Sequence, residues 1–174
     1  MTDDTSGSFI ETPALSVTET DNLVDPELQA KLKRITDLLP DALKFVIDAR
    51  TVPLESASMA VYVEKQWKPA QCWLLSNGCL IASRKAKVSL TQGVRHKLTF
   101  ERFYPVEGLL LSDVKNTADL QNCFKLKNPE LGSVFLHTED EEAKETWMRQ
   151  IQKIIQENQE QKQSKHKMIQ MIIY

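Results

Sequence analysis

The side chains of this chain that are best suited to binding chemistry are the Lys and Arg residues of its middle third. Residues 60–102 hold eight basic residues and two acidic ones, although the whole chain of 174 residues has a net charge of −2. Because ammonium and guanidinium groups bind phosphate strongly, we predict that two basic groups donate hydrogen bonds to anionic lipid. The alternative, that they form an ordinary solvated surface, stays open. The two groups are Lys65 with Lys68, and Arg84 with Lys85 and Lys87.

Trp67 lies between the two lysines of the first group, in a segment that we expect to be a hairpin loop. An aromatic ring at a loop tip can insert at the headgroup level of a membrane, so Trp67 is the membrane-insertion candidate. Nucleic acid is a second class of anionic partner. Proteins that bind single strands stack the bases on several aromatic rings, and the basic segments contain only Trp67. Nucleic acid is therefore not expected as a partner.

No arrangement of residues that is typical of an enzyme is present in the sequence. There is no glycine-rich phosphate loop, no metal-ligand spacing and no nucleophile elbow, and the three His residues lie far apart. We therefore expect a protein that is not an enzyme and that holds neither a metal ion nor a cofactor.

The composition is that of a soluble globular protein, with 41% hydrophobic and 26% charged residues. No apolar run reaches the roughly 20 residues that cross a bilayer as a helix. The first 24 residues are acidic and lack the apolar segment of a signal peptide. Cys72, Cys79 and Cys123 are odd in number and lack metal-ligand spacing, so we expect free thiols in a cytoplasmic protein.

The elements that position the basic groups are predicted as about seven short β-strands between residues 50 and 137. Apolar and polar residues alternate in several segments, such as residues 59–64, as they do in half-buried strands. Asn77-Gly78 lies between two apolar segments and predicts a tight hairpin turn with positive φ angles. Residues 84–93 lack a sustained pattern and are predicted to form a loop. This arrangement places both basic groups at the open end of a small β-barrel.

Two helices are predicted to flank the strands. Asp25-Pro26 is a typical helix start, and apolar residues at helical spacing follow it. The second helix begins with a capping box formed by Thr138 and Glu141. Its apolar face carries Trp147, which we interpret as a structural residue that plugs one end of the barrel. The predicted organisation is a disordered acidic leader (1–24), a short amphipathic helix (25–39), a β-rich domain (40–160) and a polar tail with an apolar end (161–174).

Seven strands followed by one Trp-bearing helix resemble a pleckstrin-homology (PH) domain, over about residues 40–160. The resemblance implies a mainly β fold, a PH-like seven-stranded antiparallel β-barrel or sandwich capped by a C-terminal α-helix and preceded by a short N-terminal helix. Within that family the chain is most similar to the PH domain of the exocyst tethering subunit known as exocyst component eight. The similar segments are Leu39-Pro40, 75–83 (LSNGCLIAS), 104–109 (YPVEGL), 124–126 (FKL) and 145–148 (ETWM).

The resemblance implies a targeting and tethering module in exocytosis, in the cytoplasm and peripheral at the plasma membrane. Its implied partners are a Ral-like small GTPase or tethering-complex subunits, with contact to phosphoinositides. PH domains that bind lipid tightly place [Lys/Arg]-x-Arg on the second strand, where this chain has Gln71 and Trp73, so weak lipid binding is expected. Two alternatives stay open. One is the PH domain of a Rho-family guanine-nucleotide exchange factor, and the other is a pure protein-interaction scaffold without lipid binding.

Overall fold

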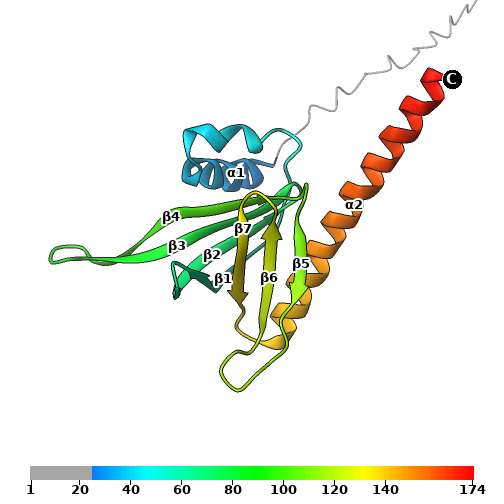
Figure 1. Cartoon of the computed structure of the whole chain (residues 1–174). Coiled ribbons are helices and arrows are strands. Elements are labelled where there is room, and N and C mark those ends of the chain that lie inside the picture. The colour runs from blue at the N-terminus through cyan, green and yellow to red at the C-terminus, as the bar shows by residue number, and fades with distance from the viewer. Residues whose placement is uncertain (1–24) are drawn as a thin grey trace, which may run out of the picture.

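The computed structural model describes residues 25–174, and the predicted disorder of residues 1–24 lies outside the described part of the chain. Figure 1 shows bent strands with a short helix on one side and a long helix on the other. In chain order the elements are α1 (Pro26–Leu38), the 3-10 helix η1 (Asp41–Val46), β1 (Pro53–Val63), β2 (Gln66–Leu75), β3 (Gly78–Ser89), β4 (Gly93–Pro105), β5 (Leu110–Asp113), β6 (Cys123–Asn128), β7 (Gly132–His137) and α2 (Glu141–Ile173).

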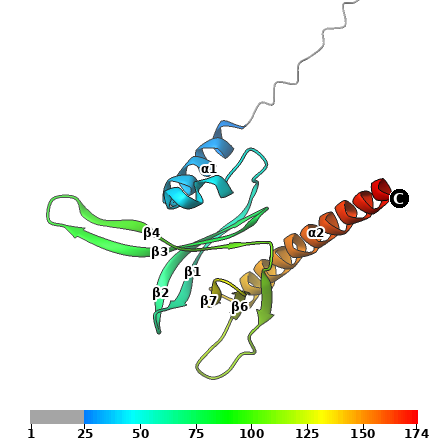
Figure 2. The ribbon, with the colours of Figure 1, turned by 45° about the horizontal axis from the view of Figure 1, so that its top comes forward.

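The seven strands form one antiparallel sheet in the order β4-β3-β2-β1-β7-β6-β5. The edge strands β4 and β5 do not pair with each other, so the fold is sandwich-like and not a closed barrel. β1 joins the two halves, because it pairs with β2 along its length and with β7 only through residues 60–62. Figure 2 shows β6 and β7 turned away from the plane of β3 and β4. The predicted strands, C-terminal helix and short N-terminal helix are confirmed.

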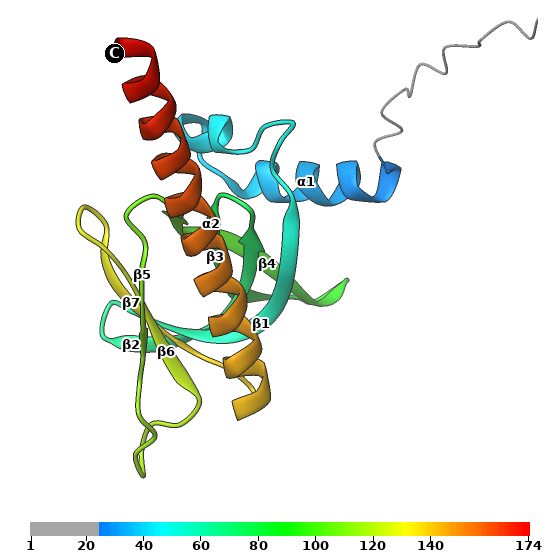
Figure 3. The same ribbon diagram turned by 90° about the vertical axis from the view of Figure 1, so that its right-hand side faces the viewer.

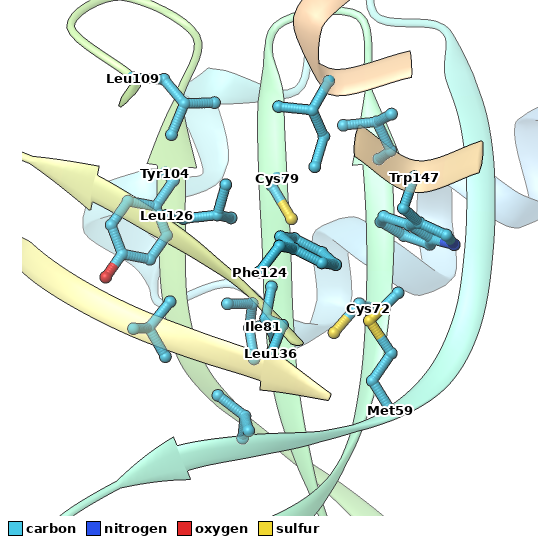
Figure 4. Close-up of a cluster of buried hydrophobic side chains, with 14 of the residues drawn as sticks. Met59, Cys72, Cys79, Ile81, Tyr104, Leu109, Phe124, Leu126, Leu136 and Trp147 are labelled. Carbon is cyan, nitrogen blue, oxygen red and sulfur yellow. The ribbon is translucent and has the colours of Figure 1, made fainter. Parts of the chain in front are cut away.

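The main core lies between the two halves of the sheet and is covered by α2. Alternate residues of the strands point into it, among them Val61, Cys72 and Ile81, which are all fully buried. Figure 4 shows the Trp147 ring of α2 over this cluster, near Phe124. Only 3% of Trp147 is exposed, so this side chain serves packing.

A second, smaller core lies on the opposite face of the sheet. Ile35 and Leu39, which come from α1 and the residue after it, pack there against Leu75 of β2, Leu80 of β3 and Phe103 of β4. The first half of β3 is therefore covered on both faces. That half, residues 78–83, reads as a continuous buried run instead of alternating.

The tight turn between β2 and β3 lies where the sequence predicts it, but the predicted reason is wrong. Neither Asn77 nor Gly78 has a positive φ angle. Gly78 is required for space, because a Cβ atom there would lie 2.3 Å from the carbonyl oxygen of Tyr104 on β4. Positive φ angles occur instead at Glu64 and Lys65, 51° and 65°, in the two-residue turn between β1 and β2.

The capping box predicted at the start of the second helix is also wrong. Asp140 is the N-cap, and its side chain accepts a hydrogen bond from the backbone N–H of Ala143 at 2.7 Å. The Thr138 hydroxyl lies 3.0 Å from the carbonyl oxygen of Asn122, because Thr138 still belongs to the extended chain that follows β7. The side chain of Thr138 thus ties the end of β7 to the β5–β6 loop instead of capping the helix.

Helix α2 continues well beyond the strands, as Figure 3 shows. Its first half packs on the core through Trp147, Ile151 and Ile154, whereas every residue from 161 onward is exposed. The segment 161–174 is therefore the exposed end of the helix. Within residues 25–174, no helix is both long and apolar enough to cross a membrane.

Candidate anion-binding site

The second basic group lies on a β-ribbon and not in a loop. β3 runs through Ser89 and β4 begins at Gly93, whose φ angle of +73° suits a glycine in the turn. β2 pairs with β3 only as far as Ser83, so residues 84–89 pair with β4 alone. The two strands project beyond the rest of the sheet in Figures 1 and 2. The loop prediction fails here because a ribbon without a buried face needs no alternation of apolar and polar residues.

The register of this ribbon places like charges directly opposite each other. Lys85 faces Lys97, and Lys87 faces Arg95. Side chains in such pairs have Cβ atoms about 4.5–5.5 Å apart, and like charges there are destabilising. None of the ion pairs found in residues 25–174 includes any of these four side chains. We call this set the cationic ribbon face.

The cationic ribbon face continues the inner surface of the sheet. Side chains alternate along a strand, so Lys85 and Lys87 point to the same side as Cys79 and Ile81, which belong to the main core. Lys68 of β2 shares that side with Ala70, another member of the main core. The structure therefore aligns Lys68, Lys85 and Lys87 on one side of the sheet.

Lys68 differs from the other lysines because a carboxylate already binds it. Its Nζ atom lies 2.6 Å from Oε2 of Glu64. This hydrogen bond, the charge of Lys68 and the weaker attraction of Lys85 lower the pKa of Glu64. The effect of Lys85 indicates that the ribbon lies near the β1–β2 turn, where Lys65 is exposed. Lys65, Lys85 and Lys87 are thus better placed than Lys68 to bind an anion.

Arg84 is the predicted lipid-binding residue that the structure places elsewhere. As the neighbour of Lys85 in a strand, it points to the opposite face of the sheet. Its guanidinium group donates hydrogen bonds to Oε1 of Gln71 at 2.7 Å and to Oγ of Ser58 at 3.0 Å. Arg84 therefore ties β3 to β2 and β1 on the outer face, apart from the cationic ribbon face.

Trp67 does not lie at a loop tip, because the turn between β1 and β2 consists of Glu64 and Lys65 and Trp67 lies within β2. Its side chain is on the outer face, where the ring centroid lies 5.3 Å from that of Tyr62. It is 41% exposed. The ring therefore points away from the side that carries Lys68 and Lys85.

An apolar tip at the end of the ribbon escaped the sequence analysis. Val88 faces Val94 across the ribbon, on the face opposite the cations, and Leu90 lies in the turn between the strands. All three side chains are more than half exposed. The signal was present in the sequence, since Ala86 and Val88 alternate with Lys85 and Lys87. This alternation indicates an apolar face only if the segment is a strand, and we predicted a loop there.

The remaining groups that could do chemistry are buried or dispersed. Cys72, Cys79 and Cys123 are buried free thiols, and burial raises the pKa of Cys79 to about 12. A thiol held protonated in this way is a poor nucleophile and a poor metal ligand. In the part of the chain that the structure describes, no three His, Cys, Asp or Glu side chains cluster so as to hold a metal ion.

Solved structures with a similar fold include fragments of exchange factors. The activated truncation of Vav1 is 16% identical, with a TM-score of 0.53, over 75% of this chain and 33% of that chain. The DH/PH fragment of PDZRHOGEF, in complex with human RhoA, is 13% identical, with a TM-score of 0.55, over 75% and 39%. The linker-DH/PH domains of p115-RhoGEF are 12% identical, with a TM-score of 0.55, over 75% and 40%.

The chain thus spans about a third to two fifths of the length of these fragments, and identities this low show only the fold. No exocyst subunit is among these neighbours. No curated protein matches the chain in sequence. The family model for the PH domain matches residues 54–156, which is more than half of the chain. The strands, the covering helix and this match together show that the chain belongs to the PH-domain family.

Proposed function

We propose that this chain is a non-enzymatic PH-type targeting module that contacts anionic, phosphoinositide-containing membranes from the cytoplasm, peripherally at the plasma membrane. The observation that carries the proposal is the cationic ribbon face, with its two pairs of like charges directly opposite each other. Such pairs destabilise an isolated sheet, and an anion bound between them offsets the repulsion.

The expected membrane contact is electrostatic and weak. A basic residue near an anionic membrane surface contributes about 1 kcal/mol, and this attraction is screened within a Debye length. The two second-strand positions that carry the strong lipid signature in other PH domains offer no cation here. Gln71 accepts a hydrogen bond from Arg84, and Trp73 packs against the α1 side of the sheet. A stereospecific headgroup pocket is therefore not proposed.

The apolar tip of the ribbon supports the same orientation at the membrane. Leu90 lies in the turn, with Val88 and Val94 next to it and Lys87 and Arg95 one residue further back. If the tip enters the headgroup region, the apolar side chains reach the acyl boundary while the longer Lys and Arg side chains stay at the phosphates.

Vesicle sedimentation of the full chain tests this proposal. We expect binding to phosphatidylcholine vesicles that contain phosphatidylserine and phosphatidylinositol bisphosphate, and a decrease in binding as salt rises. The double variant Lys85→Glu/Lys87→Glu should lose most of this binding. The matched control, Lys165→Glu/Lys167→Glu, changes the net charge equally on the exposed end of α2 and should bind like the wild type. Equal binding by both double variants would leave the pure scaffold as the better hypothesis.

A second candidate function is that of the PH domain beside the catalytic domain of a Rho-family exchange factor. Two observations support it. Structures similar to this chain include DH/PH fragments in complex with RhoA. In addition, α1 lies before the first strand, separated from it by η1, where the preceding domain of an exchange factor would end. In this role the chain would bind a small GTPase or position the catalytic domain without catalysing exchange itself.

A GTPase pull-down separates this candidate from a tethering role in exocytosis, which rests on the sequence resemblance alone. Immobilised full chain should be offered nucleotide-free RhoA, GTP-loaded RhoA and GTP-loaded Ral. Retention of RhoA supports the exchange-factor assignment, whereas retention of Ral with no RhoA supports the tethering assignment. If neither GTPase is retained, partner binding must be sought among other proteins.

A further inference from the structure

A row of aromatic side chains crosses the outer face of the sheet, and neither helix covers it. Trp67 on β2 is directly opposite Tyr62 on β1, and Tyr62 is directly opposite Phe135 on β7. Phe135 in turn is opposite Lys125 on β6. We call these four residues the aromatic row. Helix α1 packs on the outer face at a different place, against Leu75 and its neighbours in the second core.

The rings of the aromatic row form a partly exposed surface. Tyr62 is 38% exposed and Trp67 is 41% exposed, with tilted rings 5.3 Å apart. The Lys125 ammonium nitrogen lies 5.5 Å from the centroid of the Phe135 ring, as in a cation–π contact. Tyr62 and Trp67 thus present neighbouring aromatic surface to solvent on this face.

A shallow depression lies beside Trp67, at one end of the aromatic row. It is formed by the next set of opposed residues, Pro69 on β2, Ala60 on β1 and His137 on β7. These smaller side chains lie lower than the rings, and the depression has a volume of about 460 Å³. One wall is the Trp67 ring, whose centroid is 6.1 Å from that of His137. The outer face thus offers a row of rings and a depression beside its Trp67 end.

We propose that the aromatic row binds a proline-rich segment of a partner protein in the polyproline II conformation, with acidic residues at one end. Polyproline II segments dock on grooves lined by aromatic rings, because the extended helix is already formed and loses little entropy on binding. The backbone carbonyls of such a helix are free, and the indole N–H of Trp67 can only donate.

The spacing of the aromatic row supports this ligand. Trp67 and Phe135 lie two strands apart, which is about 9.6 Å at the usual strand spacing. A polyproline II helix repeats every three residues, about 9.3 Å at its usual rise. Prolines at positions i and i+3 of a bound segment therefore match the separation of the β2 and β7 backbones at Trp67 and Phe135, while the Trp67 ring itself leans toward β7, where its centroid lies 6.1 Å from that of His137.

The charge around the row fixes the direction of the segment. Beyond Phe135 lie Lys125 and, two residues along β6, Lys127, and neither is in an ion pair with another described residue. At the other end, Glu139 is among the residues that line the depression beside Trp67. An acidic residue of the ligand is therefore attracted to the Phe135 end. The cationic ribbon face is on the other side of the sheet, so a membrane bound there leaves the aromatic row accessible.

Nuclear magnetic resonance on the full chain tests this inference. The probe is acetyl-Asp-Asp followed by five prolines and an amide, and the control peptide has Gly and Ser in place of the prolines. The chain has three Trp residues, and only Trp67 belongs to the row, while Trp73 and Trp147 pack on the two cores. We expect the indole N–H signal of Trp67 alone to shift with the proline probe, and none to shift with the control peptide.

Two variants locate the site. Trp67→Ala should weaken binding of the probe about tenfold, as for a central aromatic residue of an interface. Phe45→Ala is the matched control, because Phe45 is 76% exposed and lies outside the row, and it should bind normally. Lys125→Glu should weaken binding of the probe about threefold and leave a probe of five prolines without Asp unchanged.

Several outcomes would overturn the inference. One is equal shifts with the proline and the Gly-Ser probe, and another is no shift of the Trp67 signal at millimolar probe. If the Trp67 signal instead shifts with protein concentration or with anionic vesicles, the row is a self-association or membrane surface. A loss of binding in Trp67→Ala counts only if its circular dichroism matches the wild type. If Trp67→Ala fails to fold, Lys125→Glu still tests the inference, because Lys125 is at the surface.

Discussion

The two halves of strand β3 both pair with β4, but only the inner half also pairs with β2 and is covered on both faces. Residues 78–83 are all buried, because the main core covers one face and the α1 core covers the other. In residues 84–89 no side chain is buried, although pairing with β4 continues. This difference in burial shows what determines the residue types in each half. Packing selects apolar side chains in the inner half, whereas Lys85 and Lys87 of the outer half, which face Lys97 and Arg95 of β4, are better explained by the proposed ligand.

A bulge lies close to the boundary between the two halves. Ile81 pairs with Arg102 but Ala82 pairs with Phe100, so Glu101 is an extra residue on β4. Bulges bend a strand and increase its twist, and they often re-aim side chains at functional sites. Glu101 thus marks the place where the ribbon leaves the sheet.

The largest expected difference between the halves is in stability. Ile81→Ala should lower the free energy of unfolding by about 2–5 kcal/mol, since it leaves a cavity in the main core. Val88→Ala in the outer half should change it by less than about 0.5 kcal/mol, because Val88 is 79% exposed. Urea denaturation followed by circular dichroism measures both. Similar losses in the two variants would mean that the ribbon is packed and not free.

The inner half should also respond to high pH through Cys79. Its thiol keeps its proton up to about pH 12 in the folded protein, whereas an unfolded thiol has its usual pKa of 9.0. Between these values the unfolded state binds fewer protons, so the free energy of unfolding falls as pH rises.

Urea unfolding at pH 8 and pH 10.5 measures this loss. The control is Cys79→Ala, in which the loss between the two pH values should be smaller than in the wild type. Equal losses would show that other groups, such as the Lys and Tyr side chains, cause the alkaline sensitivity.

Substitutions of Arg84 and Lys85 test whether these neighbouring residues of β3 point to opposite faces of the sheet. Arg84→Ala removes hydrogen bonds to Gln71 and Ser58 and should cost about 1 kcal/mol of unfolding free energy. Its binding to anionic vesicles should fall less than that of Lys85→Ala, because Arg84 is on the outer face. Sedimentation and urea titration of both variants decide this. Equal loss of vesicle binding would restore Arg84 to the lipid-binding set.

The smallest expected effect is that of Lys87→Glu, which should change stability and vesicle binding in opposite directions. Lys87→Glu replaces a repulsive pair with Arg95 by an attractive one and should raise the free energy of unfolding by about 0.2–1 kcal/mol. The same variant should bind anionic vesicles more weakly. Lys165→Glu, on the exposed end of α2, controls for the change in net charge. A destabilised Lys87→Glu protein would contradict the register of the cationic pairs.

Much of the fold could be predicted because its signals are local. The turn after Leu75 and the helix start at Asp25-Pro26 are where the sequence places them. The predictions were wrong where a residue type that suits one structural role has another role in the fold. Gly78 was interpreted as a turn residue, but it is required by the close approach of Tyr104 from β4. Thr138 has the side chain of a helix cap, but it hydrogen-bonds a loop.

The candidate site was predicted only in part. Lys85 and Lys87 were found from composition, but Lys97 and Arg95 were not. Which residues face each other depends on the register between β3 and β4, which composition does not give. Arg84 was grouped with Lys85 because adjacent residues in a loop can share a site. Adjacent residues in a strand cannot, since their side chains point to opposite faces.

The sequence by itself determined the order of the elements, the apolar residues that form the core and the excess of positive charge in the middle of the chain. These follow from local propensity and from hydrophobic periodicity, which need no knowledge of distant contacts. Only the tertiary structure decided which cations oppose one another, which face carries Trp67, and that Tyr62 and Phe135 complete a row with it. Such alignments arise from pairing between residues far apart in the chain, such as Tyr62 and Phe135, which local patterns do not encode.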